Sequence, residues 1–456
     1  MKNYNCDIAI IGAGIVGIAT AYYLKKLSPE TSVVLIDASD PMALTSAQSG
    51  ENYRNWWPHP VMTAFTDHSI DLMEELAVDT GNLINMNRRG YVLTTREDNL
   101  DKLMDELAYG YSQLHHNEIR IHENGTGTYQ KPVSPSWQDA PSGVDVIRDR
   151  SLIKETYPSF DRSIKTVVHI RRAGAISSQQ TGQHMLNAFK TASGEFINAE
   201  VTAINHHGGF QLLSKQNITV NAERIVNAAG PYINNVAKML SVELPVSNVL
   251  QQKIAFEDTA KAIPRTMPFS IDLDAQTIDW TDEERSLLCE DKEYEWLTQE
   301  MPGAIHCRPE GGDNGTWLKL GWAFNSTVQQ PDRTPRLIDS FPEIVLRGAA
   351  RLNPALKHYI SDLPVSLHHY GGFYTLTDEN WPLIGPVSAG GNTDSAYVAG
   401  AMSGFGTMAA AAAGELCARL MTKKSVPGFA SALSPQRYEN TELMNELAAL
   451  SQRGIL

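Results

Sequence analysis

Cysteine is scarce in this chain of 456 residues, which has only Cys6, Cys289, Cys307 and Cys417 and no Cys-x-x-Cys pair. This scarcity argues against a disulfide framework and against a cysteine-based zinc site, so we expect no metal. It fits a reducing compartment. A signal peptide is also missing, because Lys2 leads into an apolar strand pattern without a cleavage site. We therefore expect a cytoplasmic protein.

Two further absences limit the possible partners. The formal net charge is −14 and the sequence pI about 5.4, with no basic cluster interleaved with aromatic residues, so we expect no nucleic-acid partner. A charge-free stretch over residues 396–414 is about as long as a membrane span, but its glycine and alanine content favours a buried helix. We therefore expect no membrane span. The chain length suggests more than one domain.

The most informative pattern that is present begins almost at the first residue. Residues 6–11 are an apolar run that predicts a buried strand, and Gly-x-Gly-x-x-Gly follows at 12–17. A helical pattern continues to about Leu27, and a second apolar run, 33–36, ends at Asp37. Strand, glycine turn, helix, strand and acid in this order are typical of a βαβ unit that binds a dinucleotide.

The glycines and the acid of this unit are each needed for a physical reason. Gly12 permits the tight turn, Gly14 lets the backbone approach a pyrophosphate, and Gly17 lets helix and strand pack closely. The N-terminus of the helix offers free N–H groups and a partial positive charge. The carboxylate of Asp37 can bind a ribose hydroxyl. No second Gly-x-Gly-x-x-Gly occurs in mid-chain, which disfavours a flavoprotein that also uses a nicotinamide cofactor.

Four more motifs follow in a recognisable order. They are Val201, Asn227-Ala228-Ala229-Gly230, Tyr374–Asp378 with Pro382–Pro386, and Gly400 with Ser403–Gly406 before an alanine-rich helix. With the first unit, they make most of the chain resemble the D-amino-acid oxidase, glycine oxidase and sarcosine oxidase superfamily of FAD-dependent amine oxidoreductases. The last glycine turn opens a helix, whose N–H groups can face the electron-rich end of a reduced flavin.

The resemblance implies an α/β fold in which a Rossmann-like FAD-binding domain is interleaved with a sheet-rich α+β substrate or cap domain. We assign residues 1–83, 169–240 and 367–435 to the FAD-binding domain and 84–168 and 241–366 to the substrate domain, with a helical tail over 436–456. The residues that it implies for FAD are Gly12, Gly14, Ile15, Val16, Gly17, Asp37, Ala38, Ser46, Gln48, Ser49, Gly50, Val201, Ala229, Gly230, Gly372, Ser403, Gly404, Phe405, Gly406 and Thr407.

The chain departs from some relatives at two places. Relatives that tether the flavin covalently do so through a His or Cys, whereas residues 46–50 contain neither and Gly372 stands where sarcosine-oxidase-like members have the tethering Cys. We therefore expect non-covalent FAD. Some relatives hold a substrate carboxylate with a basic residue two positions after the final glycine. Met408 stands there in this chain, which argues against a simple small amino acid as substrate.

Several residues are candidates for the substrate site. Arg54 lies in a segment that passes beside the flavin in the family, and its planar fork can pair with a carboxylate. It can equally be a structural arginine paired with an FAD phosphate or an acid, and Trp56 and Trp57 can wall a pocket or pack in the core. The other candidates are Tyr370 and Tyr374 before the flavin-facing motif, Arg308 beside His306 in an alternating strand, and Lys253 or Lys261 as a lysine that stabilises forming superoxide.

The resemblance implies oxidation of an amine or amino-acid C–N bond to an imine by hydride transfer to the flavin, with O2 as acceptor and H2O2 as product. The expected partners are a small amine or amino-acid substrate and O2 or another electron acceptor. Two alternatives stay open. One is a dehydrogenase of the same fold that uses a quinone or protein acceptor or oxidises a 2-hydroxy acid, and the other is a flavin-binding regulatory protein without turnover.

Overall fold

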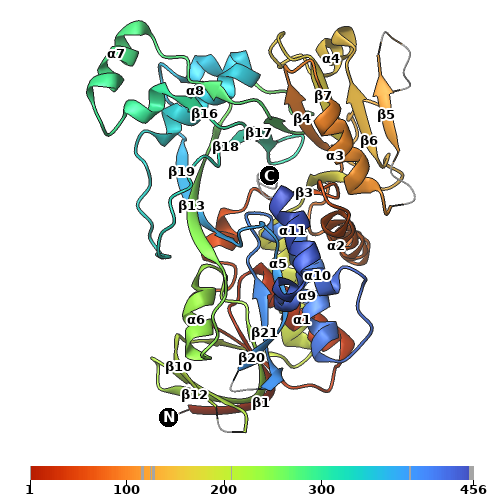
Figure 1. Ribbon diagram of the computed structural model, residues 1–456, viewed down its shortest axis with the longest axis vertical. Coiled ribbons are helices and arrows are strands. Elements are labelled where there is room, and N and C mark those ends of the chain that lie inside the picture. The colour runs from red at the N-terminus through yellow and green to blue at the C-terminus, as the bar shows by residue number, and fades with distance from the viewer. Residues whose placement is uncertain are drawn as a thin grey trace.

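The computed structural model describes residues 2–114, 118–123, 125, 129–206, 208–389 and 392–450. Its elements gather around two large sheets, one at each end of an elongated molecule (Figure 1). The predicted α/β class is confirmed. Within the described residues, no helix combines the length and the apolar character needed to cross a lipid bilayer.

The sheet that contains the N-terminal strand has eight strands from three distant parts of the chain. The order β10-β11-β12-β1-β2-β9 is extended by β21, which pairs with β12 and with β20. The pairs β12–β1, β1–β2, β2–β9 and β12–β21 are parallel. The bounds are β1 (Lys2–Ile11), β2 (Val33–Asp37), β9 (Glu195–Asn198), β10 (Val201–His206), β11 (Phe210–Ser214), β12 (Ile218–Asn227), β20 (Leu383–Ala389) and β21 (Asn392–Gly400).

Two helices beside this sheet begin at the place where the first and the last glycine motifs lie. Helix α1 (Ile15–Leu27) and helix α9 (Gly406–Met421) pack tightly, since a Cβ on Gly414 would lie 2.5 Å from the backbone of Ala19. Apolar side chains from both helices fill one core with β1 and β2. The other helices of this half are α2 (Pro60–Asp79), α5 (Ser178–Thr191), α6 (Ile233–Met239), α10 (Ala430–Leu433) and α11 (Thr441–Leu450).

The second sheet has nine strands in the order β19-β13-β18-β17-β14-β4-β7-β6-β5. Their bounds are β4 (Tyr91–Thr95), β5 (Ile119–His122), β6 (Val144–Ile147), β7 (Thr166–Ile170), β13 (Ser247–Glu257), β14 (Phe269–Asp272), β17 (Ile305–Glu310), β18 (Trp317–Gly321) and β19 (His368–Leu376). Helices α3 (Asp101–Tyr111), α4 (Arg150–Thr156), α7 (Asp282–Glu290) and α8 (Phe341–Leu352) accompany it, and short pairs join β3 (Asn52–Arg54) to β8 (Ala173–Ala175) and β15 (Gln276–Thr277) to β16 (Glu300–Met301).

One helix end differs from the sequence expectation, and one strand pairing fixes where the chain changes sheets. The sequence pattern predicts a charged helix over about residues 282–300, but helix α7 ends at Glu290; it buries no side chain, and a capping box of Thr281 and Glu284 stabilises its first turn. Strand β19 pairs with β13 in the nine-stranded sheet, so the chain returns to the other sheet after residue 376. Part of the predicted tail, residues 451–456, lies outside the described residues.

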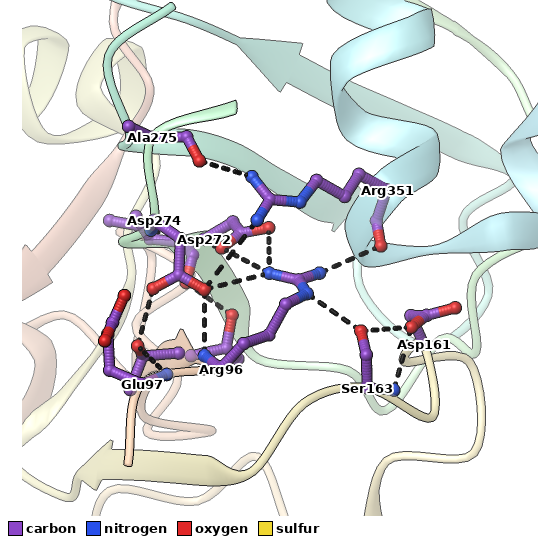
Figure 2. Close-up of polar contacts among 11 residues, drawn as sticks. Arg96, Glu97, Asp161, Ser163, Asp272, Asp274, Ala275 and Arg351 are labelled. Carbon is purple, nitrogen blue, oxygen red and sulfur yellow. Dashed lines mark hydrogen bonds and ion pairs between the residues drawn. The ribbon is translucent and has the colours of Figure 1, made fainter. Parts of the chain in front are cut away.

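An ionic network stabilises the nine-stranded sheet where β4, β14 and α8 meet (Figure 2). The Arg96 guanidinium lies 2.8 Å from Asp272 and 3.1 Å from Asp274, and it also donates to the carbonyl oxygen of Arg351 at 3.0 Å. Asp272 is 0% exposed. A carboxylate so placed is tolerated only next to a cation, so Arg96 fixes the corner between strands and helix.

We predict that Arg96→Met destabilises the protein by about 3 kcal/mol, because it leaves the Asp272 carboxylate buried without a cation. The matched control is Lys165→Met, which breaks an ion pair with Asp98 whose side chains are 39% and 86% exposed. The free energy of unfolding of that variant should fall by less than about 1 kcal/mol. Urea unfolding followed by circular dichroism measures both. Equal losses in the two variants would contradict the role of Arg96.

Candidate functional site

A cavity lies where the start of α1, the strands β13, β19 and β21, and the start of α9 come together. Its lining comes from five separate stretches, namely the first glycine turn, residues 45–50, residues 228–231, residues 372–375 and residues 399–407, and from Lys253. Among the residues predicted for FAD, those on its wall are Gly14, Ile15, Val16, Ser46, Gln48, Ser49, Gly50, Gly230, Gly372, Ser403, Gly404, Gly406 and Thr407. The structure thus brings together residues that are up to about 390 positions apart in the sequence.

The first glycine turn forms one end of this cavity. Gly12 has φ +112°, and a Cβ there would lie 2.2 Å from the carbonyl oxygen of Ala228. A Cβ on Gly14, in contrast, would meet only the Ser46 hydroxyl, at 3.1 Å, and would project into the cavity. The backbone of Gly14 is therefore open to a ligand, next to the N-terminus of α1. That arrangement fits the pyrophosphate of FAD.

Asp37 ends β2 beside this turn, where the sequence predicts a ribose ligand. One of its carboxylate oxygens accepts a hydrogen bond from the Ala13 N–H at 2.6 Å and the other from the Ser39 N–H at 2.7 Å. Burial raises the pKa of Asp37 despite these donors. Each carboxylate oxygen has a further lone pair for a hydroxyl. The other predicted residues that do not line the cavity are Gly12, Gly17, Ala38, Val201, Ala229 and Phe405.

The opposite end of the cavity is the N-terminus of α9. The turn before it has left-handed backbone at Ser403 (φ 42°) and Gly404 (φ 88°), and the buried Ser403 hydroxyl has no hydrogen-bond partner among the described residues. The Ser49 and Thr407 hydroxyls lie 2.7 Å apart. Free N–H groups, hydroxyls and the positive end of a 16-residue helix meet here, which fits the electron-rich edge of a flavin ring.

A second, smaller cavity adjoins the first. Both are lined by Ser49, Gly50, Lys253, Tyr374, Ser403, Gly404 and Thr407. The remaining wall is largely apolar and aromatic, from Trp57, Tyr91, Phe269, His306, Phe405 and Met408, with Glu51 and Asn52 at one side. Met408 therefore presents an apolar side chain inside this cavity. A small organic molecule with an apolar part fits such a wall.

The structure separates the two candidate lysines. Lys253 on β13 is 8% exposed and lines both cavities, with its ammonium 5.4 Å from the centre of the Tyr374 ring. No carboxylate pairs with it among the described residues. Lys261 lies in the exposed turn after β13 and on neither wall. Only Lys253 brings a positive charge to the boundary of the two cavities.

Arg54 is 1% exposed and is not itself on a cavity wall. Its guanidinium carbon lies 4.6 Å from the centre of the Trp57 ring, 4.9 Å from Tyr91 and 5.8 Å from Trp56. Its Nε and Nη1 have no hydrogen-bond partner among the described residues, and burial lowers the pKa of its guanidinium. Trp57 and Tyr91 line the small cavity, so an uncompensated positive charge is held against its aromatic wall.

The mouth of the small cavity is an ionic cluster that joins the two halves of the molecule. Glu51 lies 3.0 Å from Lys319 and 3.5 Å from Arg308, and Glu310 lies 2.9 Å from Lys319. Glu51, Asn52 and Phe269 also border a wider hollow between the two halves, which Arg308 lines. The charge of Arg308 is thus already balanced by carboxylates, unlike that of Arg54.

The two candidate tyrosines are placed differently. Tyr374 lines both cavities, and its ring packs so closely on Gly404 that a Cβ there would lie 2.3 Å away. Tyr370 lies on neither wall. Its buried hydroxyl has no partner among the described residues, and burial raises the pKa of the phenol.

Sequence reasoning did not single out three residues of this region. Glu51 directly follows the predicted FAD segment, and Lys319 sits in a strand of alternating apolar residues, which is the one signal that the sequence offers for it. Phe269 begins β14 and carries no motif. Glu51 pairs with Lys319 and shares the wall of the small cavity with Phe269, although the three residues lie far apart in the chain.

The DAO family, described as FAD dependent oxidoreductase, matches residues 7–420. The uncharacterized oxidoreductase YurR of Bacillus subtilis (strain 168) is 26% identical over 270 residues, which are 57% of this chain and 63% of that protein. The match therefore spans a little under two thirds of the length of that curated relative.

Two solved structures share the fold over nearly the whole chain. L-proline dehydrogenase from P. horikoshii superposes with a TM-score of 0.71 and 17% identity, covering 96% of this chain and 99% of that one. Glycine oxidase from Geobacillus kaustophilus gives a TM-score of 0.70 and 15% identity, covering 94% and 98%. At this identity the superposition shows the fold alone. Because the family match covers most of the sequence, the chain belongs to the DAO family of FAD dependent oxidoreductases.

Proposed function

We propose that this protein oxidises the C–N bond of an amine or amino acid to an imine, with a non-covalently bound FAD and with O2 as acceptor. The observation that carries the proposal is the pair of joined cavities, one built from glycine turns and two helix N-termini and the other from aromatic rings beside two cations that no carboxylate balances among the described residues. L-proline dehydrogenase and glycine oxidase, which share the fold, are named for amino-acid substrates, and this supports the same class here.

The residues of the chain supply binding and electrostatics. Gly14, Ser46 and Asp37 would hold the pyrophosphate and ribose, and Ser403 and Thr407 would bind the polar edge of the ring. FAD, when bound, supplies a hydride acceptor that stores both electrons. The aromatic cavity excludes water and fixes the substrate, so that its α-carbon faces the boundary where Lys253 and Tyr374 lie.

The experiment that tests this function is an anaerobic screen of flavin reduction over amines, amino acids and 2-hydroxy acids, followed by admission of O2. Bleaching of the flavin absorbance by an amine, with H2O2 formed on reoxidation, supports the proposal. Reduction by a 2-hydroxy acid alone, or reoxidation by a quinone but not by O2, favours a dehydrogenase. A flavin that no substrate bleaches favours a regulatory protein.

We also propose a cytoplasmic location.

We predict that Gly14→Val abolishes FAD binding, because its side chain would fill the space beside the helix N-terminus that a pyrophosphate needs. The absorbance of the purified protein near 450 nm, a typical flavin band, measures the loss. A matched control is Gly428→Val, since an added Cβ at Gly428 meets nothing within 4 Å. Full flavin content in Gly14→Val would contradict the assignment of the turn.

In the wild type, acid precipitation should leave no flavin in the pellet, because no tether is expected.

We further propose that Arg54 holds a substrate carboxylate in the small cavity by its charge, because it is a buried cation directly behind Trp57 and Tyr91 and has no carboxylate partner among the described residues. Arg54→Met should slow flavin reduction by an N-alkyl amino acid by more than about tenfold, since losing a desolvated charge pair typically costs about 2–5 kcal/mol. FAD content should stay intact, and reduction by N-methylbenzylamine, which has no carboxylate, is the control. Loss of FAD would instead assign Arg54 to the cofactor, and unchanged rates would turn attention to Arg308.

For the oxidative half-reaction we propose Lys253 rather than Lys261, because only Lys253 lines both cavities. An ammonium there stabilises the negative charge that forms when O2 accepts an electron. Lys253→Met should slow reoxidation of the reduced enzyme by O2 at least about tenfold. Lys261→Met is the matched control and should react like the wild type in the same stopped-flow measurement. Equal rates in all three proteins would remove Lys253 from the oxygen reaction.

A further inference from the structure

The imidazole of His306 is a polar group on the wall of the small cavity that the roles proposed above leave unused. His306 lies on β17, is 7% exposed and faces the cavity together with Lys253 and Phe269. In the register of the sheet, His306 and Lys253 both pair with Gly321 on β18. A Cβ on Gly321 would lie 2.3 Å from His306 Nε2 and 3.1 Å from Lys253 Cγ. The missing side chain of Gly321 therefore makes the room in which both groups sit.

The orientation of the ring is fixed by its own strand. His306 Nδ1 lies 3.2 Å from the carbonyl oxygen of Ala304, and a carbonyl can only accept, so Nδ1 carries the proton. The other nitrogen, Nε2, then carries a lone pair. Among the described residues, the hydrogen bond of Nδ1 is the one that the His306 ring makes, so no donor reaches Nε2. The cavity thus has one ring nitrogen that needs a donor from whatever binds there.

The surroundings keep the ring in this neutral form. Burial and the neighbouring Lys253 ammonium lower the pKa of His306 to about 3. The other polar groups on the same cavity wall include the carboxylate of Glu51, which Lys319 and Arg308 already occupy. They further include the side-chain amide of Asn52, whose Oδ1 is a second acceptor without a partner among the described residues, the indole N–H of Trp57, and the hydroxyls of Ser49, Tyr91, Tyr374, Ser403 and Thr407. On this largely aromatic wall, an acceptor beside the Lys253 ammonium selects a neutral N–H donor rather than a second cation.

We propose that His306 Nε2 accepts a hydrogen bond from the N–H of the substrate amine and so makes the enzyme select amines over their oxygen isosteres. This inference rests on the proposed function, because it assigns the amine-binding group of the same cavity. It places the amine nitrogen at β17, next to the boundary with the cofactor cavity. A bound amine would keep its lone pair free, which is needed to form the C=N bond of the imine.

The test compares an amine with the same molecule in which oxygen replaces the N–H. The pairs are racemic proline with tetrahydrofuran-2-carboxylate, and racemic N-methylphenylalanine with 2-methoxy-3-phenylpropanoate. Dissociation constants for the holoenzyme come from the anaerobic flavin spectrum, as reduction by the amine or as a band shift by the isostere. In His306→Phe the preference for the amine should fall about tenfold or more, while the isostere binds as before.

Two further variants keep the result interpretable. His306→Gln offers an amide oxygen as acceptor and should restore part of the preference, which a merely structural role of the ring would not do. Should His306→Phe lose its FAD, His306→Met, which also lacks an acceptor, takes its place. An amine preference that is unchanged in the Phe and Met variants, or a loss of both ligands equally, overturns the inference alone. If the wild type is reduced only by 2-hydroxy acids, the proposed function falls and the inference falls with it.

Discussion

The carboxylate of Glu51 is the contact on which the geometry of the site depends. Its residue has left-handed backbone (φ 60°) directly after Gly50, which lines both cavities. One oxygen accepts from the N–H of Ser178 at the start of α5, at 2.9 Å, and the other faces Lys319 at 3.0 Å on β18. A single side chain therefore fixes the segment between the cavities to helix α5 and to strand β18 of the nine-stranded sheet. Removing any one member of this half-buried cluster would leave a charge unbalanced. The intact cluster therefore stabilises the arrangement.

In this arrangement, some charges of the site have a counter-ion and others do not. At the mouth, Arg308 and Lys319 are balanced by Glu51 and Glu310. Further in, Lys253 and Arg54 face aromatic rings, and no carboxylate balances them among the described residues. Burying a cation without a counter-ion is costly, so the interior favours an anionic group on the ligand or a reaction that generates negative charge. The proposed substrate brings an anionic carboxylate, and the proposed reaction with O2 generates negative charge.

Much of the cofactor cavity could be predicted from sequence because its chemistry is local. Residues 6–37 contain a whole βαβ unit, and the turn around Ser403 lies directly before its helix. The substrate side could be predicted only in part. Glu51 and Lys319 are 268 positions apart, and the choice between Lys253 and Lys261 depends on a turn that exposes one of them. The helix predicted for residues 282–300 is longer than α7, because the charge pattern does not show that tertiary contacts which would continue the helix are lacking.

The same contrast explains why cofactor and substrate recognition leave different traces. At the glycine turns, backbone N–H groups and the absence of a Cβ make the contacts, so the residue types are restricted by geometry. On β13, β17 and β18, in contrast, side chains such as Lys253 and His306 reach the cavity from a sheet whose hydrogen bonds do not depend on them. These positions can change without loss of the fold. Relatives with 15–17% identity can therefore share the architecture while differing in the molecule that they oxidise.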